Sequence, residues 1–242
     1  MKHAHIGNSL LFHFCGCIFL AAAQLSLMST ACLAQETVSL GDTKAVLRRP
    51  AAPEASVILM PGGEGRIGVG ADGTITKELK NQLVRTRMSY FQHGLAVLIV
   101  DADADLSQAV KYMAEIKRPV TVIATSRGTL RAARGIADGA RPDALVLTSG
   151  FLTNESGGRE NVANILGTPN DLPPTLVIHH KHDGCHWTSP AGVDPFIRWA
   201  AGKARVEWLD GGANSGDPCK ALGYHGFYGL DDRVVALAAG FH

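Results

Sequence analysis

Short runs of consecutive apolar residues recur along this chain, and most are followed by a segment with helical character. The runs read SVILM, LAVLIV, VTVIA, ALVLT and TLVI, and Gly, Pro or polar residues bound each of them. A continuous apolar run of this length is typical of a strand that is buried on both faces of a sheet. Strands that alternate with helices predict an α/β fold: a mostly parallel sheet with helices on both faces.

The same reading gives an order of elements along the chain. The expected strands are 36–40, 45–50, 56–60, 95–103, 120–125, 143–150, 175–180 and 204–210. The expected helices are 75–91, 105–117, 127–139, the second half of 189–203, and 231–241. Apolar residues at roughly helical spacing support the first of these helices, which Gly94 ends.

The first 34 residues have the composition of a secretory signal peptide. Lys2 lies near their start, a long run of Leu, Phe, Ile and Ala follows, and Ala34 is the fourth residue of the small-residue sequence ACLAQ. We expect cleavage near Ala34 and a secreted or periplasmic protein. An uncleaved membrane anchor is the main alternative, and a lipoprotein acylated at Cys32 is less favoured because Ser29 is unsuited to the position three before it. Residues 35–242 are then expected to form a single domain.

The charge of the chain and the cysteines that remain after residue 34 restrict the classes of partner and the cellular compartment that we expect. The net charge of the full chain is only +1 and no basic run is present, so we expect no nucleic-acid partner and, after signal removal, no membrane partner. Cys185 and Cys219 are the two cysteines left after residue 34. An isolated pair in an oxidising compartment predicts a disulfide, and two buried free thiols are the alternative.

Two short motifs follow expected strands. The segment 120–129 reads VTVIATSRGT, which is close to the G-x-S-x-G turn that presents a nucleophilic serine, with Ala124 at the first glycine position. Residues 63–68, GEGRIG, match the dinucleotide fingerprint G-x-G-x-x-G, but the third glycine leads into more loop and no carboxylate follows at the required spacing. The overlapping segment PGGEG, residues 61–65, instead suits a loop whose backbone N–H groups bind an oxyanion.

The combination of these segments resembles the α/β-hydrolase superfamily over nearly the whole chain after residue 34. The residues that carry the resemblance are ATSRG, PGGEG, HHKHDGC and GYHGF. The resemblance implies a catalytic triad in the chain order serine, acid, histidine, which here is Ser126, Asp183 and His225. It also implies an oxyanion hole made by the N–H of Arg127 and that of Gly63 or Glu64. It implies no metal and no cofactor.

Other residues compete for parts of this site. Asp210 also follows an expected strand and is the alternative triad acid. His180, His182 and His186 lie close together in sequence and suggest a metal site, but no H-E-x-x-H spacing supports it. A bridge between the two late cysteines would tie the loop that carries the acid to the loop that carries the histidine.

The resemblance implies a serine hydrolase that cleaves carboxylic esters of small soluble molecules. The connection 151–174 is short, polar and rich in Gly and Pro, so we expect it to rim a pocket without forming a lid. Arg127 and Arg66 near the site suggest an acidic group on the substrate, although solvated arginines explain them as well. The alternatives are a silent binding protein with the same fold, and a peptidase or thioesterase that keeps the nucleophile.

Overall fold

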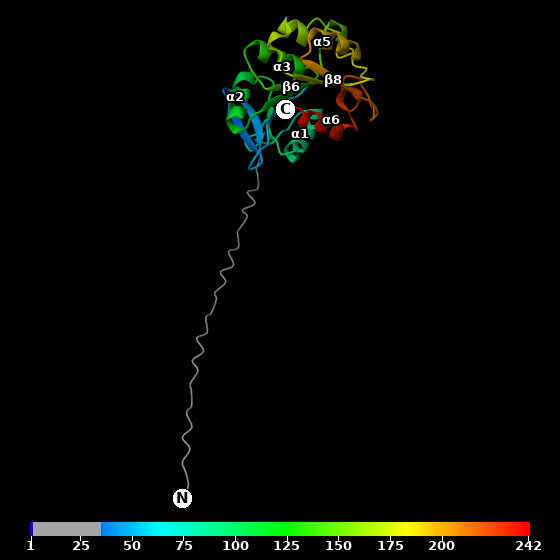
Figure 1. Cartoon of the computed structure of the whole chain (residues 1–242). Helices are drawn as coiled ribbons and strands as arrows, with labels where there is room; N and C mark the ends of the chain where they lie inside the picture. The colour runs from blue at the N-terminus through cyan, green and yellow to red at the C-terminus, as the bar shows by residue number, and fades with distance from the viewer. Residues whose placement is uncertain (2–34) are drawn as a thin grey trace. The chain divides into compact units, whose positions relative to one another are not determined.

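The computed structural model describes Met1 and residues 35–242 (Figure 1). The predicted signal peptide and the alternative anchor at Cys32 therefore lie outside the described residues. Within the described part of the chain, no helix is both long and apolar enough to cross a membrane.

One eight-stranded sheet runs through the described chain. Its strands follow the spatial order β1 (Glu36–Leu40), β2 (Thr43–Arg48), β4 (Ala96–Val100), β3 (Ser56–Met60), β5 (Val120–Thr125), β6 (Ala144–Thr148), β7 (Thr175–His180) and β8 (Ala204–Leu209). β2 pairs antiparallel with β1 and with β4, and every pair from β4 to β8 is parallel. The predicted mostly parallel sheet is confirmed.

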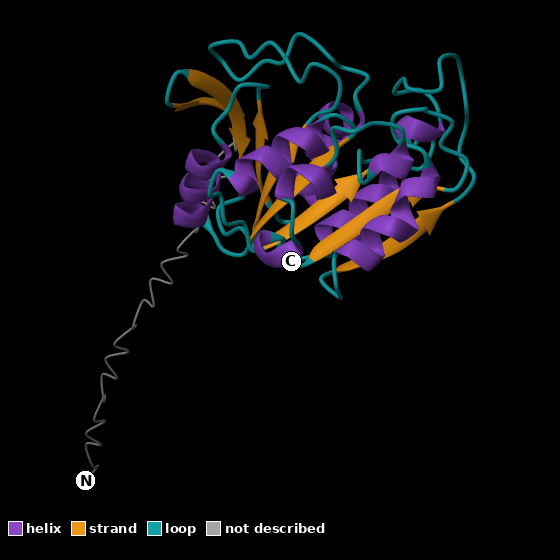
Figure 2. Cartoon of the chain, turned by 90° about the horizontal axis from the view of Figure 1, so that it is seen from above, coloured by secondary structure: helices purple, strands orange, loops and turns teal. Residues whose placement is uncertain are grey.

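Helices cover both faces of this sheet, as Figure 2 shows. One face carries α2 (Leu106–Ile116), α3 (Gly128–Ala137) and α5 (Val193–Trp199), and the other carries α1 (Gln82–Gln92) and α6 (Asp231–Ala239). The short α4 (Val162–Leu166) packs against α3. The described residues also contain four single 3₁₀ turns: η1 (Asn154–Ser156), η2 (Pro169–Asp171), η3 (Pro190–Gly192) and η4 (Tyr224–Gly226).

The sheet separates two apolar cores because successive side chains of a strand point to opposite faces. In β3, Ile58 belongs to the core beneath α2 and α3, whereas Val57 and Leu59 belong to the core beneath α1 and α6. All five residues of β3 are buried. This explains why the central strands read as continuous apolar runs rather than as an alternating pattern.

The expected helix over 75–91 is wrong in its first half. Ile75 forms an isolated antiparallel bridge with Val69, and α1 begins only at Gln82. The side chain of Asn81 accepts a hydrogen bond from the N–H of Leu83 and so caps the helix at this point. Residues 75–81 are therefore not helical, and 78–81 form part of the wall of the cavity above Ser126.

The parallel strands bring their carboxyl ends to one edge of the sheet. The loop that starts at Pro61 follows β3, Ser126 follows β5, Ser149 follows β6 and Asp183 lies shortly after β7. Sites of open α/β sheets form at this edge. Residues that are up to about 120 positions apart in sequence thus become neighbours.

Candidate active site

Ser126 occupies a strained turn between β5 and α3. Its φ is +51°, in the left-handed region that side chains with a Cβ rarely adopt. Its N–H donates to the carbonyl of Thr148 at 2.9 Å, which fixes the turn against β6. Strain of this kind persists only where the surroundings enforce it, and it is found most often at functional sites.

Two glycines allow this turn to pack. A Cβ on Gly128 would clash with the carbonyl oxygen of Met60, so α3 approaches β3 only because that side chain is missing. A Cβ on Gly62 would lie 2.9 Å from the Cβ of Ser126. Ala124, which stands at the first position of the serine motif, is fully buried in β5, so its methyl group is accommodated.

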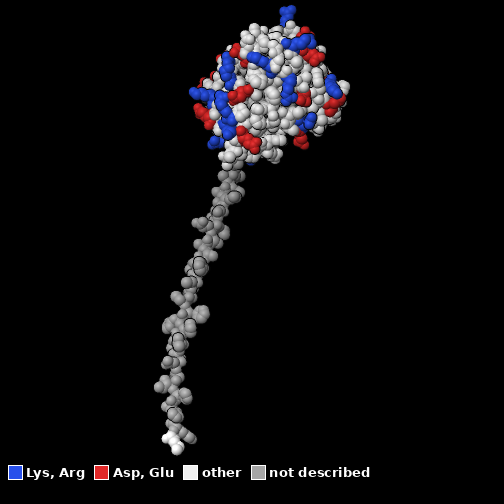
Figure 3. Space-filling view, viewed as in Figure 1, with Lys and Arg blue, Asp and Glu red and all other residues white. Residues whose placement is uncertain are grey.

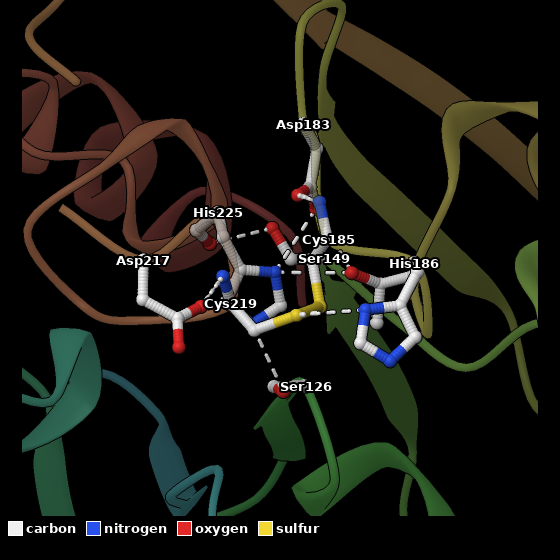
Figure 4. The surroundings of a disulfide bond; sticks show 9 residues. Ser126, Ser149, Asp183, Cys185, His186, Asp217, Cys219 and His225 are labelled. Atoms are coloured by element: carbon white, nitrogen blue, oxygen red, sulfur yellow. Dashed lines mark hydrogen bonds and ion pairs between the residues drawn. A yellow bond between two sulfur atoms is a disulfide. The ribbon is translucent and has the colours of Figure 1, made fainter. Parts of the chain in front are cut away.

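His225 lies between Ser126 and Asp183 (Figure 4). Its Nε2 is 3.0 Å from the Oγ of Ser126, and its Nδ1 is 3.0 Å from Oδ2 of Asp183. Both His225 and Asp183 are only 5% exposed. The structure thus brings together the three residues that the sequence placed in serine, acid and histidine order.

Asp183 is held as a carboxylate. Burial by itself raises the pKa of Asp183, but the hydrogen bond and electrostatic interaction with His225, together with His179 and the N–H of Cys185, hold that pKa below its ordinary value. The Cys185 N–H donates to Oδ1 at 2.9 Å. The hydroxyl of Thr188 donates to Oδ2 at 3.0 Å. The carboxylate is therefore satisfied on both oxygens while it faces the imidazole.

The turn that carries His225 is anchored from two other elements. The hydroxyl of Ser149 donates to the backbone carbonyl of His225 at 2.7 Å. The guanidinium of Arg85, on α1, donates to the carbonyl of Gly226 at 2.7 Å and pairs with Asp231. Ser149, Arg85 and Thr188 belong to no recognisable sequence motif, so the sequence alone does not mark them as site residues.

The loop after β3 presents backbone N–H groups beside Ser126. Gly63, Glu64 and Arg127 all line the same cavity as Ser126. Within the described residues, no hydrogen bond engages the N–H of Gly63, Glu64 or Arg127. The N–H of Arg127, which directly follows the serine, and that of Gly63 or Glu64 are therefore candidate donors for a negative oxygen.

Arginines of α3 and its N-terminal turn fasten this loop. Arg131 donates to the carbonyls of Pro61 and Gly63, and burial lowers its pKa from the ordinary arginine value. The Arg127 side chain forms an ion pair with Glu64 at 2.5 Å. Arg66 pairs with Asp103 at 2.9 Å. The side chains of Arg127 and Arg66 therefore have protein partners, which weakens the expectation that they select an acidic substrate.

The predicted disulfide between Cys185 and Cys219 is present in the structure. It joins the loop after Asp183 to the loop before His225, and Figure 4 shows it beside the imidazole. Cys185 is 3% exposed, and both cysteines line the cavity. The bridge is thus part of the cavity wall as well as a link between the two loops.

The cavity above Ser126 has a volume of about 980 Å³. Its wall comes mainly from the loops 62–64, 78–82 and 215–222. Its larger apolar side chains are Leu79, Phe151, Trp187 and Leu222. Its charged side chains are Glu64, Glu78, Lys80, Arg127, Asp217 and Lys220.

The connection 151–174 contributes little to this cavity. Only Phe151 of the connection lines it, and α4 packs on α3 instead of covering Ser126. The expectation that this connection forms no lid is confirmed, but its expected role as the rim belongs mostly to 78–82 and 215–222. Leu79, in 78–82, and Trp187, in the loop after Asp183, are exposed apolar residues of the cavity wall, at 57% and 45% exposure.

The competing residues lie elsewhere. Asp210 has a largely exposed side chain that pairs with Lys181 at 3.4 Å and His182 at 3.5 Å. His180 is buried, and its Nε2 is 3.0 Å from the carbonyl oxygen of Gly211. In the described ranges, no group of three or more His, Cys, Asp or Glu side chains has the arrangement to hold a metal ion. Asp183, not Asp210, therefore faces the histidine.

Comparison with known proteins identifies the fold. No protein-family profile and no curated protein sequence matches this chain. Among solved structures, it is similar to the esterase domain of a Rhodothermus marinus protein, with a TM-score of 0.58 and 16% identity over 86% of this chain and 99% of that one.

Two further solved structures have similar folds. A dienelactone hydrolase from Anabaena variabilis has a TM-score of 0.57 and 15% identity over 85% of this chain and 94% of that one. An esterase from Pyrococcus furiosus has a TM-score of 0.54 and 16% identity over 73% of this chain and 82% of that one. Together with the strand order and the turn at Ser126, these similarities show that the chain has the α/β-hydrolase fold.

Proposed function

We propose that this protein is a serine hydrolase that cleaves carboxylic esters through an acyl-enzyme. The observation that carries the proposal is the continuous line from Ser126 Oγ to His225 Nε2 and from His225 Nδ1 to Asp183, each step at 3.0 Å, at the base of an open cavity. A nucleophile within hydrogen-bond reach of a base that a third group orients is the arrangement that activates a serine.

In the first step, His225 Nε2 removes the hydroxyl proton of Ser126 as Oγ forms a bond to the ester carbonyl carbon. The carbonyl oxygen becomes an oxyanion, which the N–H of Arg127 and that of Gly63 or Glu64 would bind. The tetrahedral species then collapses, the ester C–O bond breaks, and the imidazolium gives its proton to the departing alkoxide. Asp183 remains ionised throughout and stabilises the imidazolium.

In the second step, water takes the place of the alcohol. His225 removes a proton from the water as its oxygen attacks the acyl carbon. The bond to Ser126 Oγ breaks, the serine recovers the proton, and the carboxylic acid leaves. No further group is needed for the atoms and charges to balance, which fits the expectation that the reaction uses no metal or cofactor.

The side chains that line the cavity favour small, dissolved substrates. Its wall includes six charged side chains of both signs, and no helix of the connection 151–174 covers Ser126. A site for long acyl chains would instead bury them among apolar side chains. The similar solved structures described as esterases and as a dienelactone hydrolase also support ester cleavage here.

Secretion is part of the same proposal. The Cys185–Cys219 disulfide fits an oxidising compartment such as the periplasm or the extracellular space. On the face shown in Figure 3, basic and acidic side chains are interspersed. A surface of this kind supports a small-molecule substrate over a nucleic-acid partner.

Turnover of a soluble aryl acetate tests the proposal. Ser126→Ala and Asp183→Asn should each abolish or severely reduce turnover, and circular dichroism should show that the variants remain folded. Asp210→Asn is the matched control, because that carboxylate follows the neighbouring strand yet pairs with Lys181 on the surface. Undiminished activity in Ser126→Ala would contradict the proposal, and an inert wild-type protein would favour a binding protein.

A further inference from the structure

Thr188 lies against the contact between Asp183 and His225. Its hydroxyl oxygen is 3.0 Å from Oδ2 of Asp183 and 3.0 Å from Nδ1 of His225. These two atoms are themselves 3.0 Å apart. The hydroxyl, the carboxylate oxygen and the ring nitrogen thus form a nearly equilateral triangle, and the Thr188 side chain is fully buried.

The protons in this triangle have one consistent assignment. For His225 Nε2 to accept the proton of Ser126, the ring must carry its own proton on Nδ1, and that N–H points toward Asp183. The hydroxyl of Thr188 has a single proton, and the carboxylate of Asp183 can only accept. The hydroxyl therefore donates to Oδ2, which leaves a lone pair of the Thr188 oxygen facing the Nδ1–H of His225.

We propose that Thr188 is a positioning residue for His225, an inference that rests on the proposed hydrolase function. The hydroxyl gives Nδ1–H a second acceptor on the same side as the carboxylate. It thereby favours the tautomer that leaves Nε2 free to take the proton of Ser126. It also restrains rotation of the Asp183 carboxylate, because Oδ2 is fixed by the hydroxyl while Oδ1 is fixed by the N–H of Cys185.

The backbone holds Thr188 in this place. Its N–H donates to the carbonyl of Cys185 at 3.1 Å, and the N–H of the next residue, Ser189, donates to the carbonyl of Ser156 at 2.9 Å. Since the side chain is fully buried, bulk water has no access through which it could replace the missing hydroxyl in a variant. Removal of the hydroxyl therefore leaves the pair of Asp183 and His225 without this contact.

Three substitutions at position 188 distinguish the effect of the hydroxyl from the effect of the rest of the side chain. Thr188→Val keeps the shape and removes the hydroxyl, Thr188→Ala removes both hydroxyl and methyl, and Thr188→Ser keeps the hydroxyl. For an aryl acetate, we expect kcat to fall about 10- to 100-fold in the Val and Ala variants with KM nearly unchanged, the range for a lost hydrogen bond to a charged group. The Ser variant should stay within about threefold of the wild type.

Thr121→Val is the matched control. Thr121 is also a buried threonine whose hydroxyl donates to a backbone carbonyl, that of Phe241, but it lies near the amino end of β5, away from Ser126. Its variant should keep the wild-type kcat. If the Thr188→Val variant does not fold, the Thr188→Ala variant still tests the role of the hydroxyl.

Nitrogen-15 NMR of histidine-labelled protein gives a readout that a purely structural role would not change. At about pH 8, where ordinary histidines are neutral, the wild-type His225 should show the Nδ1–H tautomer. The Val or Ala variant should keep this tautomer but show a shifted Nδ1 resonance, because its N–H loses one of two acceptors, and the Ser variant should restore the wild-type signal. Wild-type kcat together with an unchanged Nδ1 resonance in the folded Val and Ala variants would overturn the inference.

Failure of this inference differs from failure of the proposed function. If Ser126→Ala abolishes turnover but the Thr188 variants behave as the wild type, only the role of Thr188 is wrong. If Ser126→Ala retains full turnover, the proposed function itself is wrong.

Discussion

Removal of the Cys185–Cys219 disulfide should destabilise the protein much more than it slows the reaction. The two cysteines are 34 residues apart in sequence. In the chain-entropy model, a cross-link that closes a loop of this length stabilises the folded state by about 4 kcal/mol. Since the free energy of unfolding of a natural domain is about 5–15 kcal/mol, this bridge contributes a large share of it.

Equilibrium unfolding in guanidinium chloride measures this effect in the double variant Cys185→Ala, Cys219→Ala. We expect its free energy of unfolding to fall by about 4 kcal/mol, which for a domain of this size lowers Tm by about 8 to 16 °C. The kcat for an aryl acetate should fall less than about tenfold, because other contacts hold the histidine loop in register. Those contacts are the Ser149 hydroxyl on the carbonyl of His225 and the Arg85 guanidinium on that of Gly226.

The single variant Cys219→Ala is the control. It removes the same cross-link as the double variant, so the two should lose nearly the same stability, and the second substitution should add little. A loss below about 1 kcal/mol in the double variant would refute the chain-entropy reasoning. A complete loss of turnover in the folded double variant would refute the claim that the other anchors suffice.

Three further predictions follow from the site and its surroundings. Arg131→Met should lower kcat about tenfold, because it frees the loop at Pro61 and Gly63 that carries the proposed oxyanion donor. Arg134→Met, on the same helix but paired with Glu160, should have no effect on steady-state kinetics. Burial lowers the pKa of His179 below its ordinary value of 6.5. The unfolded chain therefore binds a proton as pH falls below about 6.5 while the folded protein resists it, so the free energy of unfolding should fall from pH 7 toward pH 5, and less steeply in His179→Gln. The rate on short-chain esters should rise smoothly to saturation, and a sharp increase when the substrate passes its solubility limit would contradict the open cavity.

Much of the fold was predictable because local sequence determines it. β3, β5, β6 and β7 are buried on both faces, so each leaves an uninterrupted apolar run that a single sequence reveals. Ser126 was recognisable for a similar reason, since its strained turn requires glycine or another small residue at neighbouring positions, and those are visible in ATSRG.

The parts that sequence did not reveal depend on contacts between distant segments. Arg85 contacts Gly226 across more than a hundred residues, and no local pattern marks an arginine for that role. Thr188 is one of many threonines, and only the folded loop after Asp183 places its hydroxyl against the imidazole. The prediction of a helix that begins at Ile75 was wrong for a comparable reason. The spacing of its apolar residues is helical, but Ile75 pairs with Val69 in an isolated antiparallel bridge.

Labelling with a fluorophosphonate tests the central claim most directly, because this reagent reacts with an activated serine and loses fluoride as its phosphorus bonds to the hydroxyl oxygen. The account predicts one adduct per molecule of wild-type protein, mapped by mass spectrometry to the peptide that contains Ser126. His225→Ala should label far more slowly, since Ser126 then lacks the base that lies 3.0 Å from its Oγ. An adduct on another serine, or the absence of any adduct on the folded protein, would contradict the account.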